Sequence, residues 1–319
     1  MKIFLAPMEG VADFLIRDTL TQIGGLDASV TEFIRVTNTV LGKKSFIHRC
    51  PELENQCKTQ AGTLVTPQLL GSDPEMMAAN AMVAVELGAQ SIDLNFGCPA
   101  KIVNRNLGGS VLLKSPETIF NIVNCVRKTL PEHIPLSAKI RLGYEDKSLA
   151  IDNALAVESA GAQLLVIHAR TKREGYQPPA HWDWIGKIKT HVNIPIVANG
   201  EIWSLQDYQR CQQLSGCDDV MLGRGILVRP DLAREIKDPT VPRLQPLDII
   251  KLLIAFQQQC DRLFESKYAG NRLKQWLSYL KNHYDFADKL FELVKRERQP
   301  EKIMQTLLAA QAYLCSIRG

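Results

Sequence analysis

The stretch Ser-Ile-Asp-Leu-Asn-Phe-Gly-Cys-Pro, residues 91–99, joins a short apolar run to a tight turn that carries a thiol beside a proline. It continues with Ala100 and Lys101 and is closed by Gly-Gly-Ser at 108–110. Barrels and doubly wound sheets place their chemistry at such strand-to-loop changes, because the carboxyl ends of their strands open into the active-site crevice. An isolated cysteine is more often a small buried core residue. Here the proline, the glycines and Lys101 favour a loop position for Cys98.

Short apolar runs of this kind recur along residues 1–240. Together with the opening stretch, they predict strands at 3–6, 28–33, 64–70, 136–141, 163–168, 194–198 and 219–222. Helix-like sequence follows each strand, and only after the second is the helical pattern unclear. Periodicity alone also fits a doubly wound sheet. The number of βα repeats favours a (β/α)8 TIM barrel.

The composition changes after the last of these runs. Pro239, Pro242 and Pro246 mark a linker, and no strand pattern follows them. Apolar residues then recur at helical spacing in the segments 249–263, 272–283, 286–295 and 303–317. We therefore expect an α/β chain with a TIM barrel at residues 1–240 and a small all-helical domain at residues 245–319.

The positive charge of the chain lies in the predicted helical domain. Residues 245–319 contain 12 Lys and Arg against 8 Asp and Glu, whereas residues 1–244 contain 26 of each. The formal net charge of +4 therefore comes from the last quarter of the chain. An excess of this size is often only a solvated face, but it also suits a polyanionic partner.

Composition also excludes several classes of protein. A hydrophobic fraction of 45% and a charged fraction of 23% are typical of a globular chain and argue against disorder. No window offers about 18 unbroken apolar residues, and the first residues reach Pro7 too soon for a signal peptide. The eight cysteines include no CxxC pair. We expect a cytoplasmic protein with no membrane segment, reduced cysteines and no metal site.

Polar residues collect where the predicted strands end. In a barrel these ends converge on one mouth, while inward positions lower down are filled by Val, Ile and Leu. The residues at these ends are Glu9, Gln68, Asn95, Cys98, Lys139, Arg141, His168, Asn199, Glu201 and Arg224. They include no carboxylate or histidine cluster with metal spacing and no serine elbow.

The loops after the last two strands have a composition of their own. Asn199–Glu201 and Gly223–Gly225 are glycine-bearing turns, the second with Arg224 in its centre. Backbone amides freed by glycine, together with an adjacent cation, form an anion cradle where barrels usually bind phosphate. These turns, with Lys139 and Cys98, therefore suggest a phosphorylated cofactor in the mouth.

Lys139 and Cys98 have distinct expected roles beside such a cofactor. A lysine near electron-poor ring atoms would stabilise charge that develops there. Cys98 would act as an acid on a substrate stacked over the ring. A nucleophilic role is the other chemical option, but no histidine in the loop of Cys98 would activate the thiol.

The combination of these motifs resembles the tRNA-dihydrouridine synthases over essentially the whole chain. The motifs are Leu5–Val11, Asn95–Pro99, Lys139–Gly143, His168–Thr171, Ala198–Ile202 and Gly223–Gly225. Thr31–Val36 and Leu273–Leu277 are most similar to the bacterial C-type subfamily, which acts on uridine-16 of the D loop. The variable position at Phe96 is a minor departure.

The resemblance implies an FMN-containing barrel and a helical domain that grips the D loop of tRNA, in a chain expected to be a monomer. FMN would be held by Pro7, Met8, Glu9, Gln68, Lys139, His168, Asn199, Gly200, Glu201, Gly223 and Arg224. Cys98 would be the proton donor, and Asn95 and Arg141 would meet the uridine. The remaining tRNA contacts would be Arg35, Arg272, Lys274, Tyr279 and Lys295.

The implied reaction is the reduction of a D-loop uridine to dihydrouridine. NADPH would reduce FMN, the flavin would pass hydride to uracil C6, and Cys98 would protonate C5. Two alternatives stay open from the sequence. One is a flavin barrel that reduces a free pyrimidine or another small molecule, and the other is a catalytically silent RNA-binding module. The basic helical domain argues against the first, and intact Cys98 and Lys139 argue against the second.

Overall fold

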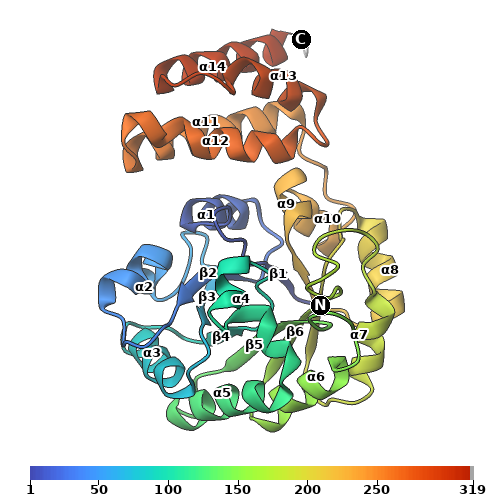
Figure 1. The fold of residues 1–319 in the computed structure, drawn as a ribbon. Helices are drawn as coiled ribbons and strands as arrows, with labels where there is room; N and C mark the ends of the chain where they lie inside the picture. Colours follow the sequence, from blue (N-terminus) through green and yellow to red (C-terminus); the bar gives the residue numbers. More distant parts are fainter. Residues whose placement is uncertain (317–319) are drawn as a thin grey trace. The chain divides into compact units, whose positions relative to one another are not determined.

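The computed structural model describes residues 1–316, and eight parallel strands form a closed barrel in it (Figure 1). The strands pair in chain order, and β1 closes the barrel by pairing with β8. They are β1 Ile3–Leu5, β2 Ala28–Arg35, β3 Leu64–Leu70, β4 Ile92–Asn95, β5 Leu136–Arg141, β6 Leu164–His168, β7 Ile196–Asn199 and β8 Val220–Leu222. This closure confirms the (β/α)8 barrel and excludes the open doubly wound sheet.

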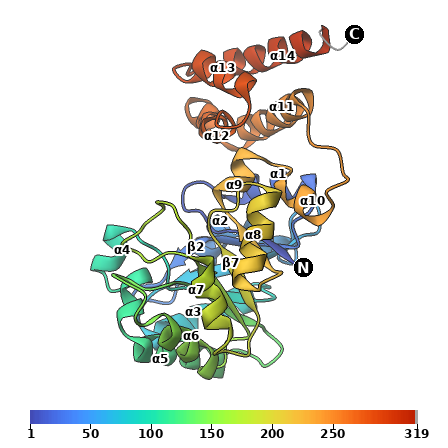
Figure 2. The ribbon, with the colours of Figure 1, turned by 90° about the vertical axis from the view of Figure 1, so that its right-hand side faces the viewer.

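Helices follow the strands and lie outside the barrel (Figures 1 and 2). They are α1 Phe14–Ile23, α2 Lys43–Arg49, α3 Pro74–Glu86, α4 Lys101–Arg105, α5 Pro116–Thr129, α6 Ala150–Ser159, α7 Trp182–Lys189 and α8 Leu205–Ser215, with 3-10 turns η1 Pro51–Asn55 and η2 Gly109–Lys114. The short helix α2 follows β2, where the sequence shows no clear helical pattern. Phe46 is its one buried residue, so it has too little of a buried face to produce one.

Side-chain caps begin the helices α3 and α5. The carboxylate of Asp73 accepts from the Met76 amide at 2.9 Å, and the hydroxyl of Ser115 accepts from the Thr118 amide at 3.3 Å. A proline follows each cap residue, at a position whose missing N–H costs no helical hydrogen bond. Local sequence alone therefore sets the start of α3 and of α5.

The centre of the barrel is apolar. Its buried cluster consists of Ala6, Val30, Val166, Val197 and Met221. Small and branched apolar side chains fill these positions, and Arg141, His168 and Asn199 are the last residues of their strands. This arrangement gathers the candidate site residues at one end of the barrel.

The chain forms two compact units, and their boundary differs from the one expected between residues 240 and 245. One unit contains Met1–Asp18 and Leu26–Gly223, and the other contains Thr19–Gly25 and the chain from Arg224 onward. The helices from Arg224 onward are α9 Arg224–Val228, α10 Leu232–Lys237, α11 Pro246–Leu263, α12 Ser266–Leu280, α13 Asp285–Val294 and α14 Pro300–Ser316.

Side-chain contacts explain why α9 and α10 belong with the C-terminal helices. The indole of Trp276 on α12 donates to the carbonyl of Leu227 on α9 at 3.1 Å, and its ring meets Phe256 edge-on at 5.0 Å. Gly25, at φ +87°, lies against α10, where a Cβ would be 2.5 Å from the carbonyl carbon of Ala233. Such tertiary contacts leave no periodic signal in the sequence.

The predicted C-terminal helices are all present, and all four begin earlier than expected, α13 by one residue and α14 by three. Pro246, which we assigned to the linker, is the first residue of α11, where its fixed φ suits a helix start. Helix α12 begins at Ser266 and not at Arg272. Ile317, the expected last residue of the final helix, lies outside the described residues. Among the helices of residues 1–316, none has both the length and the apolar character needed to span a bilayer.

Candidate active site

A chain of buried hydrogen bonds connects β3, β4 and β5 at the carboxyl end of the barrel. The carboxylate of Asp93 accepts from the Ser137 hydroxyl at 2.5 Å and from Gln68 Nε2 at 2.7 Å. Gln68 Oε1 then accepts from Asn95 Nδ2 at 2.7 Å. Because an ionised carboxylate only accepts, Asp93 fixes the direction of the Gln68 amide, and Gln68 fixes that of Asn95.

Asn95 in turn holds the loop that carries the thiol. Its Oδ1 accepts from the backbone amides of Gly97 and Cys98, each at 2.9 Å. On the other side, the carbonyl of Cys98 accepts from the Ser110 amide at 3.0 Å and from Asn104 Nδ2 at 2.9 Å. The backbone of Cys98 is therefore fixed from both sides.

The environment of Cys98 favours the protonated thiol. Burial raises the pKa of this thiol above its ordinary value, and a hydrogen bond from the Ala100 backbone and the charge of Arg141 offset the rise only in part. The side chain still keeps partial access to solvent. A protonated, accessible thiol on a rigid loop suits a proton donor better than a thiolate nucleophile.

Lys139 on β5 is a buried cation of the barrel mouth. Its Nζ donates to Asn199 Oδ1 on β7 at 2.9 Å, and Asn199 Nδ2 donates to the carbonyl of Met221 at 2.8 Å. Burial and the neighbouring Arg141 guanidinium lower the pKa of Lys139 to about 7, although the charge of Asp93 raises it. Lys139 is therefore poised between its charged and neutral forms near neutral pH.

Arg141, at the end of β5, connects the Cys98 loop to the loop after β6. Its Nε donates to the carbonyl of Gly97 at 2.8 Å, and its Nη1 donates to the carbonyls of Thr171 at 3.1 Å and Gly175 at 2.9 Å. The guanidinium also lies 5.2 Å from the centre of the Tyr176 ring. These contacts place a buried cation beside the Cys98 loop.

The ends of β6 and β7 meet through a buried arginine. Arg170 has no exposed surface, and it donates to the carbonyl of Gln177 at 2.6 Å and to the carboxylate of Glu201. Its Nη1 also lies 3.5 Å from Nε2 of His168. Glu201 receives a second hydrogen bond, from the indole of Trp203 at 2.8 Å. The side chains of His168 and Glu201 are thus oriented by the same guanidinium.

The turn after β7 presents unpaired backbone amides. Gly200 adopts φ +118°, and a Cβ there would lie 2.9 Å from Cδ2 of His168, so a side chain has no space. The carbonyl of Gly200 accepts from the Trp182 indole at 2.9 Å. The amides of Gly200 and Glu201 donate to no acceptor within residues 1–316. Two adjacent free N–H groups can bind an anion.

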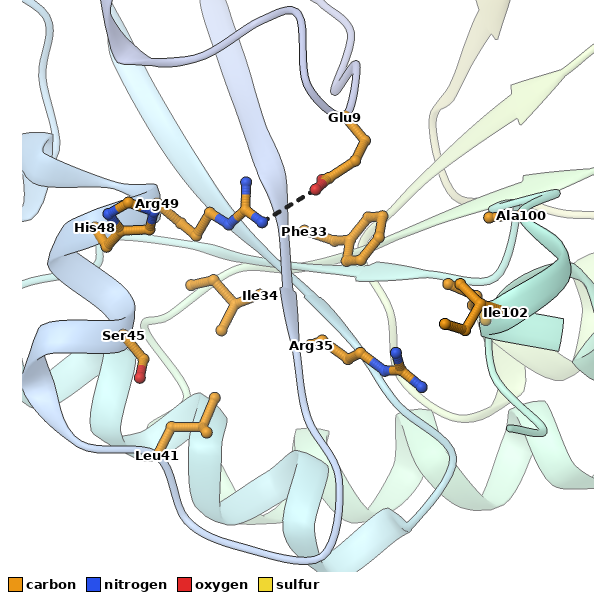
Figure 3. A pocket seen from close by; sticks show the side chains of 11 residues that line it. Glu9, Phe33, Ile34, Arg35, Leu41, Ser45, His48, Arg49, Ala100 and Ile102 are labelled. Carbon is orange, nitrogen blue, oxygen red and sulfur yellow. Dashed lines mark hydrogen bonds and ion pairs between the residues drawn. The ribbon is translucent and has the colours of Figure 1, made fainter. Parts of the chain in front are cut away.

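The remaining barrel candidates lie in the loops after β1 and β8. Pro7 and Met8 follow β1, and a Cβ at Gly223, directly after β8, would lie 3.8 Å from Sδ of Met8. Glu9 in the β1 loop is part of a cavity that also contains Arg35, the last residue of β2 (Figure 3). Glu9 is ion-paired there with Arg49 at 3.0 Å.

Comparison with known proteins shows the family to which this chain is related. The family model described as dihydrouridine synthase matches residues 4–312. A tRNA-dihydrouridine(16) synthase of Aquipseudomonas alcaligenes is 50% identical over 316 residues, which cover 96% of this chain and 99% of that protein. The tRNA-dihydrouridine(16) synthase of Shewanella oneidensis is 48% identical over 98% of this chain and 99% of its own length.

This chain is a member of the dihydrouridine synthase family. It is an enzyme of the oxidoreductase class, as the resemblance in its motifs indicates.

Solved structures resemble the fold of this dihydrouridine synthase at low sequence identity. An old yellow enzyme homologue from Zymomonas mobilis is 12% identical with a TM-score of 0.51, covering 76% of this chain and 90% of that one. Histamine dehydrogenase from Rhizobium sp. 4-9 is 14% identical with a TM-score of 0.56, covering 81% of this chain and 48% of that one. At such identities the likeness concerns the fold alone.

The second unit of the synthase contains the other predicted tRNA contacts and Arg224. Arg272 Nη1 donates to Gln275 Oε1 at 2.6 Å, and Lys274 Nζ donates to the carbonyl of Glu297. Lys295 forms an ion pair with Glu292, Tyr279 is half-buried on α12, and Arg224 is the first residue of α9. Burial lowers the pKa of Lys274. These residues lie in a different unit from Cys98 and Lys139, and their contact with RNA stays a prediction.

Sequence reasoning missed three polar residues that organise the site. Asp93 and Arg170 lie inside quoted motifs, but their roles depend on which strand neighbours they meet. Glu174 is the third: it accepts from Lys147 at 2.7 Å and from the Thr171 amide at 2.7 Å, and it lies 3.0 Å from Nε2 of His181. Although burial raises the pKa of Glu174, these partners lower it to about 2. The sequence does contain one signal for such a residue, because Asp93 is a charged residue inside an otherwise apolar strand.

Proposed function

We propose that this enzyme is an FMN-dependent tRNA-dihydrouridine synthase that reduces a D-loop uridine, at position 16, with NADPH. The proposal rests chiefly on the identity of 48–50% with tRNA-dihydrouridine(16) synthases over nearly the full chain. The fixed, protonated Cys98 and the poised Lys139 supply the chemistry that such a reduction needs.

The residues at the barrel mouth suit a flavin mononucleotide. The free amides of Gly200 and Glu201 suit its phosphate. Arg224 belongs to the other unit, and we propose it for this phosphate from the sequence alone. The Lys139 amine and the amide of Gln68 are hydrogen-bond donors for the polar edge of a flavin ring. Pro7–Glu9, His168, Asn199 and Gly223 complete the residues that would hold FMN. When bound, FMN supplies the hydride that adds to uracil C6.

The protein itself would position the base and move one proton. Asn95 and Arg141 flank the Cys98 loop and would orient the uracil by hydrogen bonds to its polar edge. Cys98, with its raised pKa, keeps the proton until carbon C5 of the reduced base can take it. The Lys139 cation would stabilise negative charge that develops in the mouth. General acid catalysis of this kind typically contributes roughly 10²–10⁴-fold in rate.

A base inside folded tRNA must leave its stack before it can enter a barrel mouth. Extruding one nucleotide costs a few kcal/mol, which contacts to the rest of the RNA have to offset. Arg35 in the barrel unit and Arg272, Lys274, Tyr279 and Lys295 in the helical unit are the residues we propose for those contacts. Phosphate contacts set the register of the RNA, and the register selects the uridine.

The main alternative is a flavin barrel that reduces a free pyrimidine. The basic helical segment argues against it, because a free base needs no further basic surface. A silent RNA-binding module is the second alternative, and it predicts a colourless protein.

One experiment separates the three functions. The purified protein is denatured, the released chromophore is identified by its spectrum and mass, and NADPH-dependent reduction is measured on tRNA, uridine and uracil. We expect FMN and activity on tRNA alone. FAD would overturn the cofactor, activity on free uridine or uracil would favour the small-molecule reductase, and no flavin after reconstitution would favour the silent module.

A further inference from the structure

A cavity of about 510 Å³ lies beside the Cys98 loop (Figure 3), and Glu9 and Arg35 are the members of its lining to which a role has been assigned above. It is formed by the end of β2, helix α2 and the segment that begins α4. Its volume lies within the range of about 300–1,000 Å³ that is usual for ligand sites.

Three polar side chains that line the cavity are available to a ligand. The guanidinium of Arg35 and the side chains of Ser45 and His48 have no hydrogen-bond or ion-pair partner within residues 1–316. Arg49, by contrast, is held by Glu9 at 3.0 Å and by Glu32 at 3.5 Å. Arg35 is therefore the free cation of the cavity, and it can pair with an anion.

An apolar wall lies next to this cation. Phe33 and Arg35 are two positions apart on β2, so their side chains leave the strand on the same face. Figure 3 shows both pointing toward Ile102 on α4. Ile102 is 65% exposed, so its side chain is accessible to a ligand. An aromatic ring, an exposed aliphatic side chain and a free guanidinium suit a nucleobase with its phosphate.

The apolar wall lies close to Cys98 along the chain. Ala100 and Ile102 line the cavity, and Cys98 is only two residues before Ala100. If a uridine reaches Cys98 while still part of an RNA strand, the nucleotides joined to it must lie at the rim of the mouth. The cavity is a formed site at that rim.

We propose that this cavity binds a nucleotide directly flanking the target uridine, with its base between Phe33 and Ile102 and its phosphate at Arg35. This inference rests on the proposed action on tRNA. It adds a second base-binding site, which would hold the strand in register while the uridine occupies the mouth. The adenylate half of NADPH has similar chemistry and is the competing occupant.

The test combines changes in the RNA with changes in the cavity. Unmodified tRNA transcripts are prepared with an abasic nucleotide on the 5′ or the 3′ side of the target uridine. Single-turnover reduction by the flavin-reduced holoenzyme is measured for wild type, Phe33→Leu, Ile102→Ala and Lys44→Gln. Lys44 is an exposed cation of α2 that does not line the cavity, so Lys44→Gln is the matched control. Ile102→Ala changes an exposed side chain and is expected to fold.

We expect one of the two abasic transcripts to react roughly 5- to 100-fold more slowly with wild type, the range for losing one stacked base. This loss should shrink in Phe33→Leu and in Ile102→Ala but persist in Lys44→Gln. The proposal is wrong if neither abasic site slows the reaction, or if the loss is the same in all four proteins. A raised KM for NADPH in Ile102→Ala, without any change toward tRNA, would assign the cavity to the reductant. Failure of wild type on the intact transcript would instead refute the action on tRNA, and this inference with it.

Discussion

The substitution Lys139→Met measures how much folding free energy the protein loses by burying a protonated lysine in the barrel mouth. Burial, and next the Arg141 guanidinium, lower the pKa of Lys139 from 10.5 to about 7 in the folded protein. Between these two pH values the unfolded chain binds a proton that the folded protein does not. The cost to folding is therefore complete below about pH 7, decreases as the pH rises, and vanishes near pH 10.5.

The size of the effect follows from the same two pKa values. The gap between 10.5 and about 7 corresponds to about 5 kcal/mol, at about 1.36 kcal/mol per pKa unit. Methionine removes this cost but also loses the hydrogen bond to Asn199, which stabilises by about 1 kcal/mol. Flavin-free Lys139→Met should thus be about 4 kcal/mol more stable than wild type near pH 6 and about 1 kcal/mol less stable near pH 11.

The assay is urea unfolding of both proteins at a series of pH values, after removal of any bound flavin. The difference in unfolding free energy should change sign between about pH 9 and pH 10. Lys101→Met, which removes an exposed lysine on α4, is the control for a lysine-to-methionine change outside the barrel mouth and should not reproduce the gain in stability near pH 6. A wild type that is more stable than Lys139→Met near pH 6, or a difference independent of pH, would refute the reasoning.

Three further predictions concern the thiol, the phosphate turn and the helical unit. Cys98→Ala should bind flavin and be reduced by NADPH like wild type, yet reduce tRNA roughly 10²–10⁴-fold more slowly in single-turnover assays; near-native turnover would refute the proton-donor role. Gly200→Ala forces an L residue to φ +118° with its Cβ 2.9 Å from His168, so thermal unfolding should show a loss of at least about 1–3 kcal/mol in the free energy of unfolding. Titration should also show weaker FMN binding, and unchanged values would contradict the account of this turn. Replacing Arg272 and Lys274 together by Ala should weaken tRNA binding and reduce its log–log salt dependence by about two at most, while flavin reduction by NADPH stays unchanged; an unaltered affinity and slope would place the RNA surface elsewhere.

The strand pattern of the sequence predicted the barrel well, because each buried parallel strand reads as a short apolar run. The caps at Asp73 and Ser115 were predictable for a similar reason, since capping depends on neighbours in the chain. Helix α2 was not predictable, because its one buried residue, Phe46, produces no periodic pattern. The unit boundary was not predictable either, since the contact between Trp276 and Leu227 joins residues 49 positions apart.

In the candidate site too, positions set by the local sequence were predictable, whereas contacts between residues from different strands were not. The strand-end position of Cys98, Lys139 and Asn199 follows from the sequence, and the structure brings Lys139 and Asn199 within 2.9 Å. The role of Asp93 does not follow, because it depends on Gln68 and Ser137 from two other strands. The free guanidinium of Arg35 does not follow from the sequence either, because it depends on the residues that form the cavity around it.

The most direct test of the central claim is to map dihydrouridine, nucleotide by nucleotide, in tRNA from a strain that lacks this gene. Dihydrouridine carries two more hydrogens than uridine, so mass spectrometry of tRNA fragments identifies each modified position. We predict that dihydrouridine disappears from position 16 alone and returns when the wild-type gene, but not the Cys98→Ala variant, is restored. Unchanged dihydrouridine at position 16, or its loss at another position only, would contradict the account.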